Sequence, residues 1–182
     1  MLELRIHGYG GQGTVTMAAL IAAAGLAAGF QSQTLPFFGV ERRGSPVKAA
    51  VRLNKGEIRM RSQSVEPDYL IVMNKNLLSL ALEGGIKPSN GRILLNAVNN
   101  DLEQVVDFPV SYVDADGIAL KEGLVHGGEP YANIPMFGAV CHYLDLPKEV
   151  IRPVLLNKWP GDIGNKNADV AEMGYDALVV AK

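Results

Sequence analysis

The sequence predicts an α/β fold with three layers, built on a mixed, mostly parallel sheet with an inserted β-hairpin and a helical C-terminal region. Residues 2–7 alternate between apolar and polar and lead through a glycine-rich turn into the alanine-rich segment 14–28, which is the order strand, turn, helix. From Pro67 onward, short apolar runs alternate with helical segments, as in β-α-β units. Residues 47–53 and 58–61 alternate on either side of an Asn-Lys-Gly turn, which indicates a hairpin.

The other elements follow from local patterns and from the residues that interrupt them. We expect further strands at 31–34, 69–73, 92–95 and 111–113, and further helices at 76–82, 135–144, 149–157 and 168–180. The first helix should end near Gly29, and Pro36 should stop the second strand. Asp114 and Asp116 are placed to cap the helix near Gly117, although Asp114 also stands where α/β proteins bind ligands.

The first strand departs from the pattern of a strand that is buried on both faces. Leu2, Leu4 and Ile6 alternate with charged or polar residues, whereas a strand covered on both sides is almost continuously apolar. One face of this strand must therefore meet polar groups.

Length and composition fit one ordinary globular domain, residues 1–182. The chain is 48% hydrophobic and 20% charged, with a net charge of -2, so the overall balance favours neither nucleic acid nor an anionic membrane as a partner. Its longest apolar stretch, 15–28, is short for a membrane span, and we expect a cytoplasmic protein. Cys141 is the only cysteine, which excludes an internal disulfide and a four-thiolate iron-sulfur cluster held by this chain alone.

A G-x-G-x-x-G turn is the first candidate binding site. Its residues are Gly8, Gly10, Gly11, Gln12, Gly13 and Thr14. Such a turn brings a helix N-terminus close to a phosphate, but it equally suits close packing against another chain. The acidic residue that normally binds a ribose about 20 positions later is missing, because 31–34 reads Gln-Ser-Gln-Thr. NAD and NADP therefore lose support. An anion or another cofactor remains open, and so does a tight turn that serves packing or subunit contact.

The loop between Pro36 and Pro46 is the second candidate site, and we interpret it as an interface. It contains Phe37, Phe38, Glu41, Arg42 and Arg43. Aromatic and arginine side chains anchor protein interfaces. The alternative is that the phenylalanines fold onto the local core and the arginines are solvated.

Four cations on the expected hairpin could form one basic ribbon, with Arg59 and Arg61 as candidate interface residues. The set is Lys48, Arg52, Arg59 and Arg61. A ribbon of this kind could receive an anionic cosubstrate or an acidic partner, whereas the alternative is a solvated face.

Catalytic signatures are missing from the sequence, so we predict no catalytic residue and no metal site. It contains no H-E-x-x-H, G-x-S-x-G, S-x-x-K or C-x-x-C. Cys141 and His142 are adjacent, and neighbours on a helix diverge by about 100°, so they would not form a thiolate-imidazole pair. His7 and His126 have no companions at metal-ligand spacing.

Several motifs together resemble the gamma subunit of pyruvate and related 2-oxoacid:ferredoxin oxidoreductases. They are the turn at 8–13, F-G-V-E-R-R-G-S-P-V at 38–47, R-M-R-S-Q at 59–63 before E-P-D-Y at 66–69, N-I-P-M-F-G-A at 133–139 and W-P-G at 159–161. The resemblance covers nearly the whole chain. Two departures are Tyr9, where the family often has a basic residue, and Phe37, where a small polar one is common.

The resemblance implies a Rossmann-like domain that braces an oxygen-sensitive complex and is inactive alone. In that family the complex decarboxylates a 2-oxoacid, transfers the acyl group to coenzyme A and reduces ferredoxin. Thiamine diphosphate with magnesium lies between the alpha and beta subunits, and iron-sulfur clusters lie in beta and delta. By this resemblance, the glycine turn and the Arg42-Arg43 loop would face partner subunits or coenzyme A. The sequence of residues 41–46 favours the members of the family that act on pyruvate. The alternatives are a freestanding nucleotide-binding enzyme and a regulatory scaffold.

Overall fold

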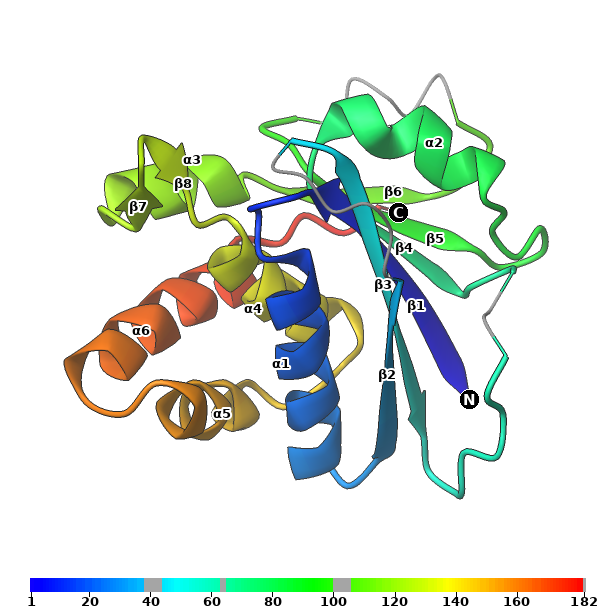
Figure 1. The fold of residues 1–182 in the computed structure, drawn as a ribbon, viewed down its shortest axis with the longest axis horizontal. Helices are drawn as coiled ribbons and strands as arrows, with labels where there is room; N and C mark the ends of the chain where they lie inside the picture. Colours follow the sequence, from blue (N-terminus) through cyan, green and yellow to red (C-terminus); the bar gives the residue numbers. More distant parts are fainter. Residues whose placement is uncertain (38–43, 63–64, 100–105, 182) are drawn as a thin grey trace.

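The structure is a computed structural model that describes residues 1–37, 44–62, 65–99 and 106–181 (Figure 1). A six-stranded sheet in the order β2-β3-β1-β4-β5-β6 forms its centre. The strands are β1 (Leu2–Tyr9), β2 (Gln31–Phe37), β3 (Pro46–Asn54), β4 (Tyr69–Val72), β5 (Arg92–Asn96) and β6 (Val110–Val113). β1, β4, β5 and β6 pair in parallel, whereas β3 pairs antiparallel with both β1 and β2. The predicted mixed, mostly parallel sheet is therefore confirmed.

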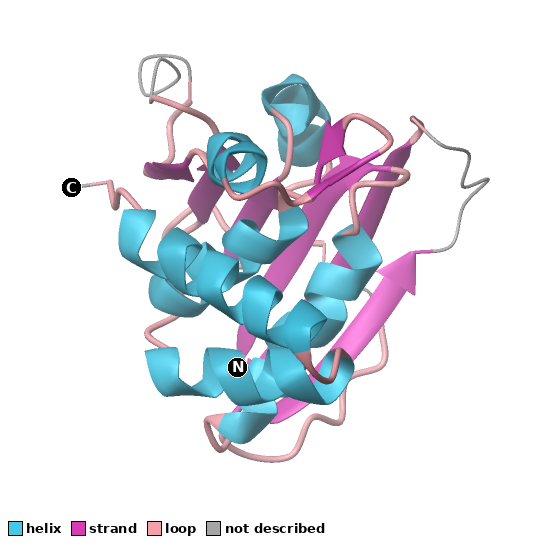
Figure 2. Ribbon diagram, turned by 90° about the vertical axis from the view of Figure 1, so that its left-hand side faces the viewer, coloured by secondary structure: helices cyan, strands magenta, loops and turns pink. Residues whose placement is uncertain are grey.

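Helices cover both faces of the sheet, which confirms the three layers and the helical C-terminal region. One face carries α1 (Thr14–Ala27), α4 (Asn133–Tyr143), α5 (Ile151–Lys158) and α6 (Asp162–Ala177), which lie together in front of the strands in Figure 2. The other face carries the 3-10 turn Lys75–Leu77 and α2 (Leu78–Glu83). Each face of the sheet has its own hydrophobic core. Alternate residues of β5 contribute to the two cores: Leu94 packs in the core under α1 and α4, and Ile93 and Leu95 pack in the core under α2.

A small subdomain extends from the carboxyl end of β6. It consists of α3 (Ala115–Lys121), β7 (Val125–His126) and β8 (Glu129–Pro130), at the upper left of Figure 1. The two short strands pair antiparallel around Gly127 and Gly128, which both have positive φ. None of the helices in the described ranges combines the length and hydropathy that a membrane span requires.

The predicted hairpin between 47–53 and 58–61 is wrong. β3 pairs with β1 from Leu2↔Leu53 to Tyr9↔Pro46 and with β2 on its other side, so both of its edges are occupied. Residues 58–61 lie outside the strands. The inserted hairpin is instead formed by β2 and β3, which follow each other in the chain and pair in full.

Pro36 does not stop the second strand, as we had expected, because β2 continues to Phe37. β2 is the edge strand of the sheet, and Pro36 stands opposite Ala49 on β3. An edge strand tolerates proline because only one of its sides bonds to a neighbour. The final helix also differs, since α6 ends at Ala177 and Val179 forms an antiparallel bridge with Tyr112.

The predicted basic ribbon is not formed, because Arg52 is only 1% exposed. Its Nε lies 2.6 Å from Oε1 of Glu3, and its guanidinium donates to the carbonyl oxygens of Met60 and Ser62. Arg52 thus fixes the irregular segment that the sequence suggested was a strand. Arg59, by contrast, is exposed and pairs with Glu57 at 2.8 Å.

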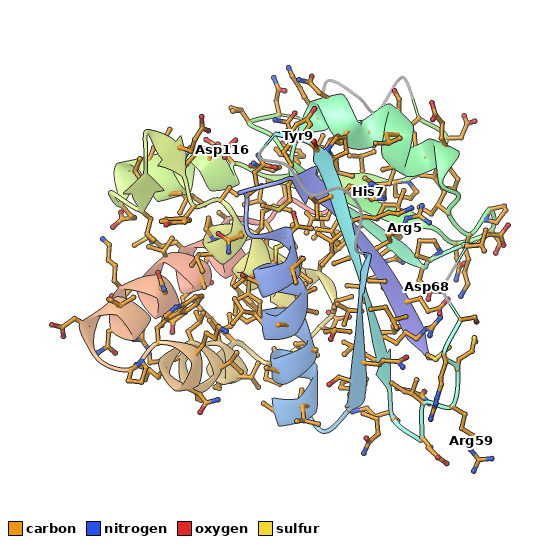
Figure 3. The ribbon with its side chains drawn as sticks, viewed as in Figure 1. Arg5, His7, Tyr9, Arg59, Asp68 and Asp116 are labelled. Carbon is orange, nitrogen blue, oxygen red and sulfur yellow. The ribbon has the colours of Figure 1, made fainter. Side chains whose placement is uncertain are left out.

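The polar face of β1 is occupied by a buried arginine that contacts the end of α2 (Figure 3). Arg5 is 4% exposed and donates to the carbonyl oxygens of Ala81 at 2.9 Å and Gly84 at 2.8 Å, and also to those of Val65 and Gly85. The last carbonyls of a helix lack partners within the helix and attract a cation. The alternation in the first strand therefore correctly predicted polar partners.

His7 lies beside Arg5 on the same face and is held neutral. Its Nε2 accepts a hydrogen bond from Nε of Arg5 at 3.0 Å, and the side chain is 5% exposed. Burial, together with the positive charges of Arg5 and Lys48, lowers the pKa of His7 to about 4. Its role is structural, as expected for a histidine without metal-binding companions.

Replacing Arg5 by methionine should destabilise the chain strongly. Arg5→Met leaves several carbonyl oxygens around the end of α2 without a donor, so we expect a loss of about 3 kcal/mol in the free energy of unfolding by urea. Arg59→Met makes the same change at an exposed ion pair and should leave that free energy unchanged within error. Equal effects of the two substitutions would contradict the role assigned to Arg5.

Stability should fall as the pH drops from about 6.5 to about 4, because of His7. In this window the unfolded state binds a proton at His7 that the folded state excludes, so the contribution is complete above pH 6.5 and decreases below it. Between pH 7 and pH 5 this amounts to about 2 kcal/mol. His7→Gln keeps an acceptor for Arg5 but cannot titrate, so urea unfolding at the two pH values should show a smaller pH effect in this variant. The same pH effect in both proteins would exclude His7 as its source.

Candidate functional site

A pocket of about 700 Å³ opens at the carboxyl ends of the parallel strands. Its lining comes from the glycine turn, the residues before β3, the end of β4, and the subdomain of α3, β7 and β8 with the residue that follows it. The lining residues are Tyr9, Gly10, Gly11, Gln12, Gly44, Asn74, Asp116, Leu120, Gly127, Glu129, Pro130 and Tyr131. Tyr9 and Asp116 lie at this end of the sheet in Figure 3. This edge is where open α/β sheets bind their ligands. It is therefore the candidate functional site.

One wall of the pocket is the glycine turn, which is fixed by short hydrogen bonds. Oε1 of Gln12 accepts from the backbone N of Tyr9 at 2.8 Å. The backbone N of Gly10 donates to the carbonyl oxygen of Ser45 at 2.8 Å, and N of Gly44 donates to the carbonyl oxygen of Gly10 at 3.2 Å. The turn is thereby joined to the residues that lead into β3.

Two of the glycines are required by close packing. Gly13 has φ 73°, and a Cβ there would lie 2.6 Å from the side-chain amide of Asn133 on α4. A Cβ on Gly8 would lie 2.2 Å from Oγ1 of Thr14. The spacing of Gly8 and Gly13 is thus explained by the contacts of β1 and α1 within the chain, without a phosphate.

The first turn of α1 nevertheless contains polar groups that could still form hydrogen bonds. Its N-cap, Gly13, supplies no side-chain hydrogen bond, and the first turn carries no acidic residue. Oγ1 of Thr14 and Oδ1 of Asn133 are buried and have no hydrogen-bond partner among the described residues. The turn therefore serves packing and still offers polar groups at a helix N-terminus.

The opposite wall of the pocket is acidic and is positioned by the ends of β5 and β6. Oδ1 of Asn96 accepts from the backbone N of Ala115 at 2.9 Å and of Asp116 at 3.3 Å, which orients the start of α3. Asp114 caps this helix by accepting from N of Gly117 at 2.8 Å, as predicted. Asp116, in contrast, lines the pocket together with Glu129.

The carboxyl of Asp116 is held in an unfavourable electrostatic environment. Partial burial raises its pKa, and the negative charges of Asp114 and Glu129 raise it further, whereas a hydrogen bond from Asn96 opposes this.

The predicted site residues separate into two groups in the structure. Of the predicted turn residues, Gly10, Gly11 and Gln12 line the pocket, whereas Gly8, Gly13 and Thr14 are not in its lining. Arg59 lies at the opposite end of the sheet, as Figure 3 shows. Arg61 is exposed in the same segment as Arg59. The other predicted interface residues are Phe37, which ends β2, and Phe38, Glu41, Arg42 and Arg43, which lie outside the described residues.

Sequence reasoning missed the part of the pocket that comes from the second half of the chain. It did not identify Asn74, Leu120, Glu129 and Tyr131, and it considered Asp116 only as a cap. One available signal was the pair Gly127-Gly128, which is typical of a two-residue hairpin turn.

The other candidate reactive groups are structural. Cys141 is fully buried, and this burial raises the pKa of its thiol. His142 instead contacts α6, with its Nδ1 2.6 Å from the carbonyl oxygen of Tyr175 and its ring stacked on that of Tyr175. The described parts of the chain contain no group of three or more His, Cys, Asp or Glu side chains that could hold a metal ion.

The fold and the site define an α/β domain with a pocket at the carboxyl ends of its parallel strands. Comparison with known proteins specifies the class further, because the chain matches the family described as pyruvate ferredoxin/flavodoxin oxidoreductase over residues 3–177. The chain belongs to this family.

Similar proteins extend over the same length. The chain is 39% identical to pyruvate synthase subunit PorC of Methanocaldococcus jannaschii, with 98% of both chains covered. It is 38% identical to the pyruvate/ketoisovalerate oxidoreductases common subunit gamma of Thermococcus kodakarensis, covering 99% of this chain and 98% of that one. The crystal structure of pyruvate oxidoreductase subunit PORC from Thermotoga maritima superimposes with a TM-score of 0.82 and 27% identity, covering 100% and 98% of the two chains.

Substitution of Gly13 should distinguish tight packing from simple turn geometry. Gly13→Ala adds a methyl group against Asn133 in addition to a left-handed backbone, so we expect a loss of about 3 kcal/mol in unfolding free energy. Gly123→Ala is the matched control, since Gly123 has φ 68° with open space around it and should cost about 1 kcal/mol. Thermal or urea unfolding of both variants measures the difference. If both lose the same amount, the contact with Asn133 does not require a glycine.

Proposed function

We propose that the chain is the gamma subunit of a thiamine-diphosphate-dependent 2-oxoacid:ferredoxin oxidoreductase, which converts pyruvate or a related 2-oxoacid to an acyl-CoA. Residues 1–182 form one gamma-type domain that is inactive alone. The observation that supports this most is the match over 98% of both chains to a pyruvate synthase subunit.

The cysteine content of this chain bears on which subunit of the complex holds the iron-sulfur clusters. Its single cysteine cannot hold an iron-sulfur cluster by itself, and it is buried. We therefore assign the iron-sulfur clusters to other subunits. The resemblance to this family's gamma subunits implies the same for thiamine diphosphate and magnesium. The partners in this proposal are the alpha, beta and delta subunits, with ferredoxin as the acceptor, in the cytoplasm.

The role we assign to the pocket edge is contact with a partner subunit, with coenzyme A as the alternative. The glycine turn and the Arg42-Arg43 loop carry this role, and Gly44 connects the two. The carboxylates of Asp116 and Glu129 line the same pocket and would repel the phosphates of coenzyme A.

A freestanding nucleotide-binding enzyme is the second candidate, and the sheet order argues against it. In the dinucleotide-binding fold, the strand that follows the first helix lies beside the first strand and carries the acid that binds the ribose. Here β3 lies between β1 and β2, and β2 has no carboxylate in Gln31–Thr34. The glycine turn and an acid on β2 would be separated by two strand spacings, about 10 Å.

Reconstitution of the complex with and without this chain tests the proposal. The alpha, beta and delta subunits are co-expressed anaerobically, and reduction of ferredoxin is measured with pyruvate and coenzyme A. We expect the complex that contains the chain to be active, and its omission to remove nearly all activity. The double variant Arg42→Ala, Arg43→Ala should assemble less well while its isolated fold is unchanged. A chain that fails to associate and binds nucleotide when isolated would contradict the proposal.

A further inference from the structure

We infer that Asn96 is a positioning residue of the pocket: it is not in the pocket lining, but its side chain joins two of the pocket walls and sets the distance between them. One wall is the segment that follows β4, where Asn74 lines the pocket, and the other is the start of α3, where Asp116 lines it. This inference rests on the proposed function, which places a partner subunit or coenzyme A at this edge. It adds the residue that gives the pocket its shape.

The hydrogen bonds of the Asn96 side chain carry the inference. Asn96 is the last residue of β5 and is 7% exposed. Its Nδ2 donates to the carbonyl oxygen of Met73, the residue before Asn74, at 3.1 Å. Its Oδ1 accepts from the backbone N of Ala115 at 2.9 Å and of Asp116 at 3.3 Å. One buried amide therefore joins the ends of β4 and β5 to the start of α3.

The first N–H groups of α3 are occupied by side chains of this same chain. Such groups have no partner within their own helix. In α3, Asn96 accepts from two of them, and Asp114 accepts from the backbone N of Gly117 at 2.8 Å. The Asn96 amide therefore acts on the helix and not on an occupant of the pocket.

An amide is needed here because the position requires a donor on one side and an acceptor on the other. A carboxylate could accept from α3 but would place its second oxygen against the carbonyl oxygen of Met73, and an aliphatic side chain makes neither contact. Ala115 and Ala119 are fully buried, so α3 remains packed on the domain when Asn96 is replaced. We therefore expect an Asn96 variant to fold, with its two walls no longer held at one distance.

Hydrogen-deuterium exchange of the isolated chain tests the link itself. Asn96→Ala removes both contacts, so residues 115–131 should exchange at least about fivefold faster than in wild type. Tyr143→Phe is the matched control, because it removes a buried hydrogen bond from the Tyr143 hydroxyl to the carbonyl oxygen of Ile93, at 3.1 Å, near the other end of β5. It should leave exchange in 115–131 unchanged. Equal acceleration by the two variants would overturn the inference.

The second measurement uses the complex reconstituted with the alpha, beta and delta subunits. We would measure the dissociation constant of the chain from the other subunits, the KM for coenzyme A, and kcat with all components saturating. Asn96→Ala should raise the dissociation constant or the KM, whichever belongs to the occupant, at least about fivefold, while kcat stays within about twofold. A mere loss of folded chain would lower the maximal rate and leave the KM unchanged.

The outcomes separate the inference from the proposed function. If wild type assembles and Asn96→Ala changes neither constant, or changes them no more than Tyr143→Phe does, Asn96 does not position the pocket. If kcat falls while both constants are unchanged, Asn96 serves stability alone and the inference is wrong. If wild type does not assemble, the subunit proposal fails, and exchange in the isolated chain still decides whether Asn96 links the two walls.

Discussion

The buried guanidinium of Arg5 is the interaction on which the arrangement of this fold depends. It lies on β1 and donates to the carbonyls of Ala81 and Gly84, so the central strand is tied directly to the end of α2. Nε of Arg5 also donates a hydrogen bond to Nε2 of His7, and burial keeps this histidine neutral. Polar contacts cover this face of β1, and the apolar side chains of α1 and α4 pack on its other face. β1 is thereby fixed in the centre of the sheet. The glycine turn follows the carboxyl end of β1 and therefore lies at the edge of the sheet where the pocket opens.

That edge combines a turn that is closed by internal contacts with a wall that carries two carboxylates. Gly8 and Gly13 are needed because Thr14 and Asn133 approach them too closely for a side chain. The turn therefore looks like a phosphate-binding motif in sequence while most of its geometry is explained by packing. Asp116 and Glu129 add negative charge opposite it.

Local patterns predicted most of the fold, and non-local contacts account for what they missed. The alternation of β1 correctly indicated polar partners, and Asp114 was recognised as a cap. The alternation of 47–53 correctly indicated a strand but could not identify the strands that pair with it. These are β1, which is distant in the chain, and β2, which comes before β3, whereas we had expected a partner that follows it. Residues 58–61 were misjudged because a single buried side chain, Arg52, holds them without strand pairing. Pocket residues from α3 and β8 meet the glycine turn only in the folded chain, so their spacing in the sequence carried no sign of a shared site.

The central claim is that the edge formed by the glycine turn and the α3–β8 subdomain faces a partner subunit. Hydrogen-deuterium exchange of this chain, free and assembled with the alpha, beta and delta subunits, tests it most directly. We expect slower exchange on assembly in residues 9–13 and 115–131, with little change at the far end of the sheet near Arg59. Protection confined to that far end, with the pocket edge unchanged, would contradict the account.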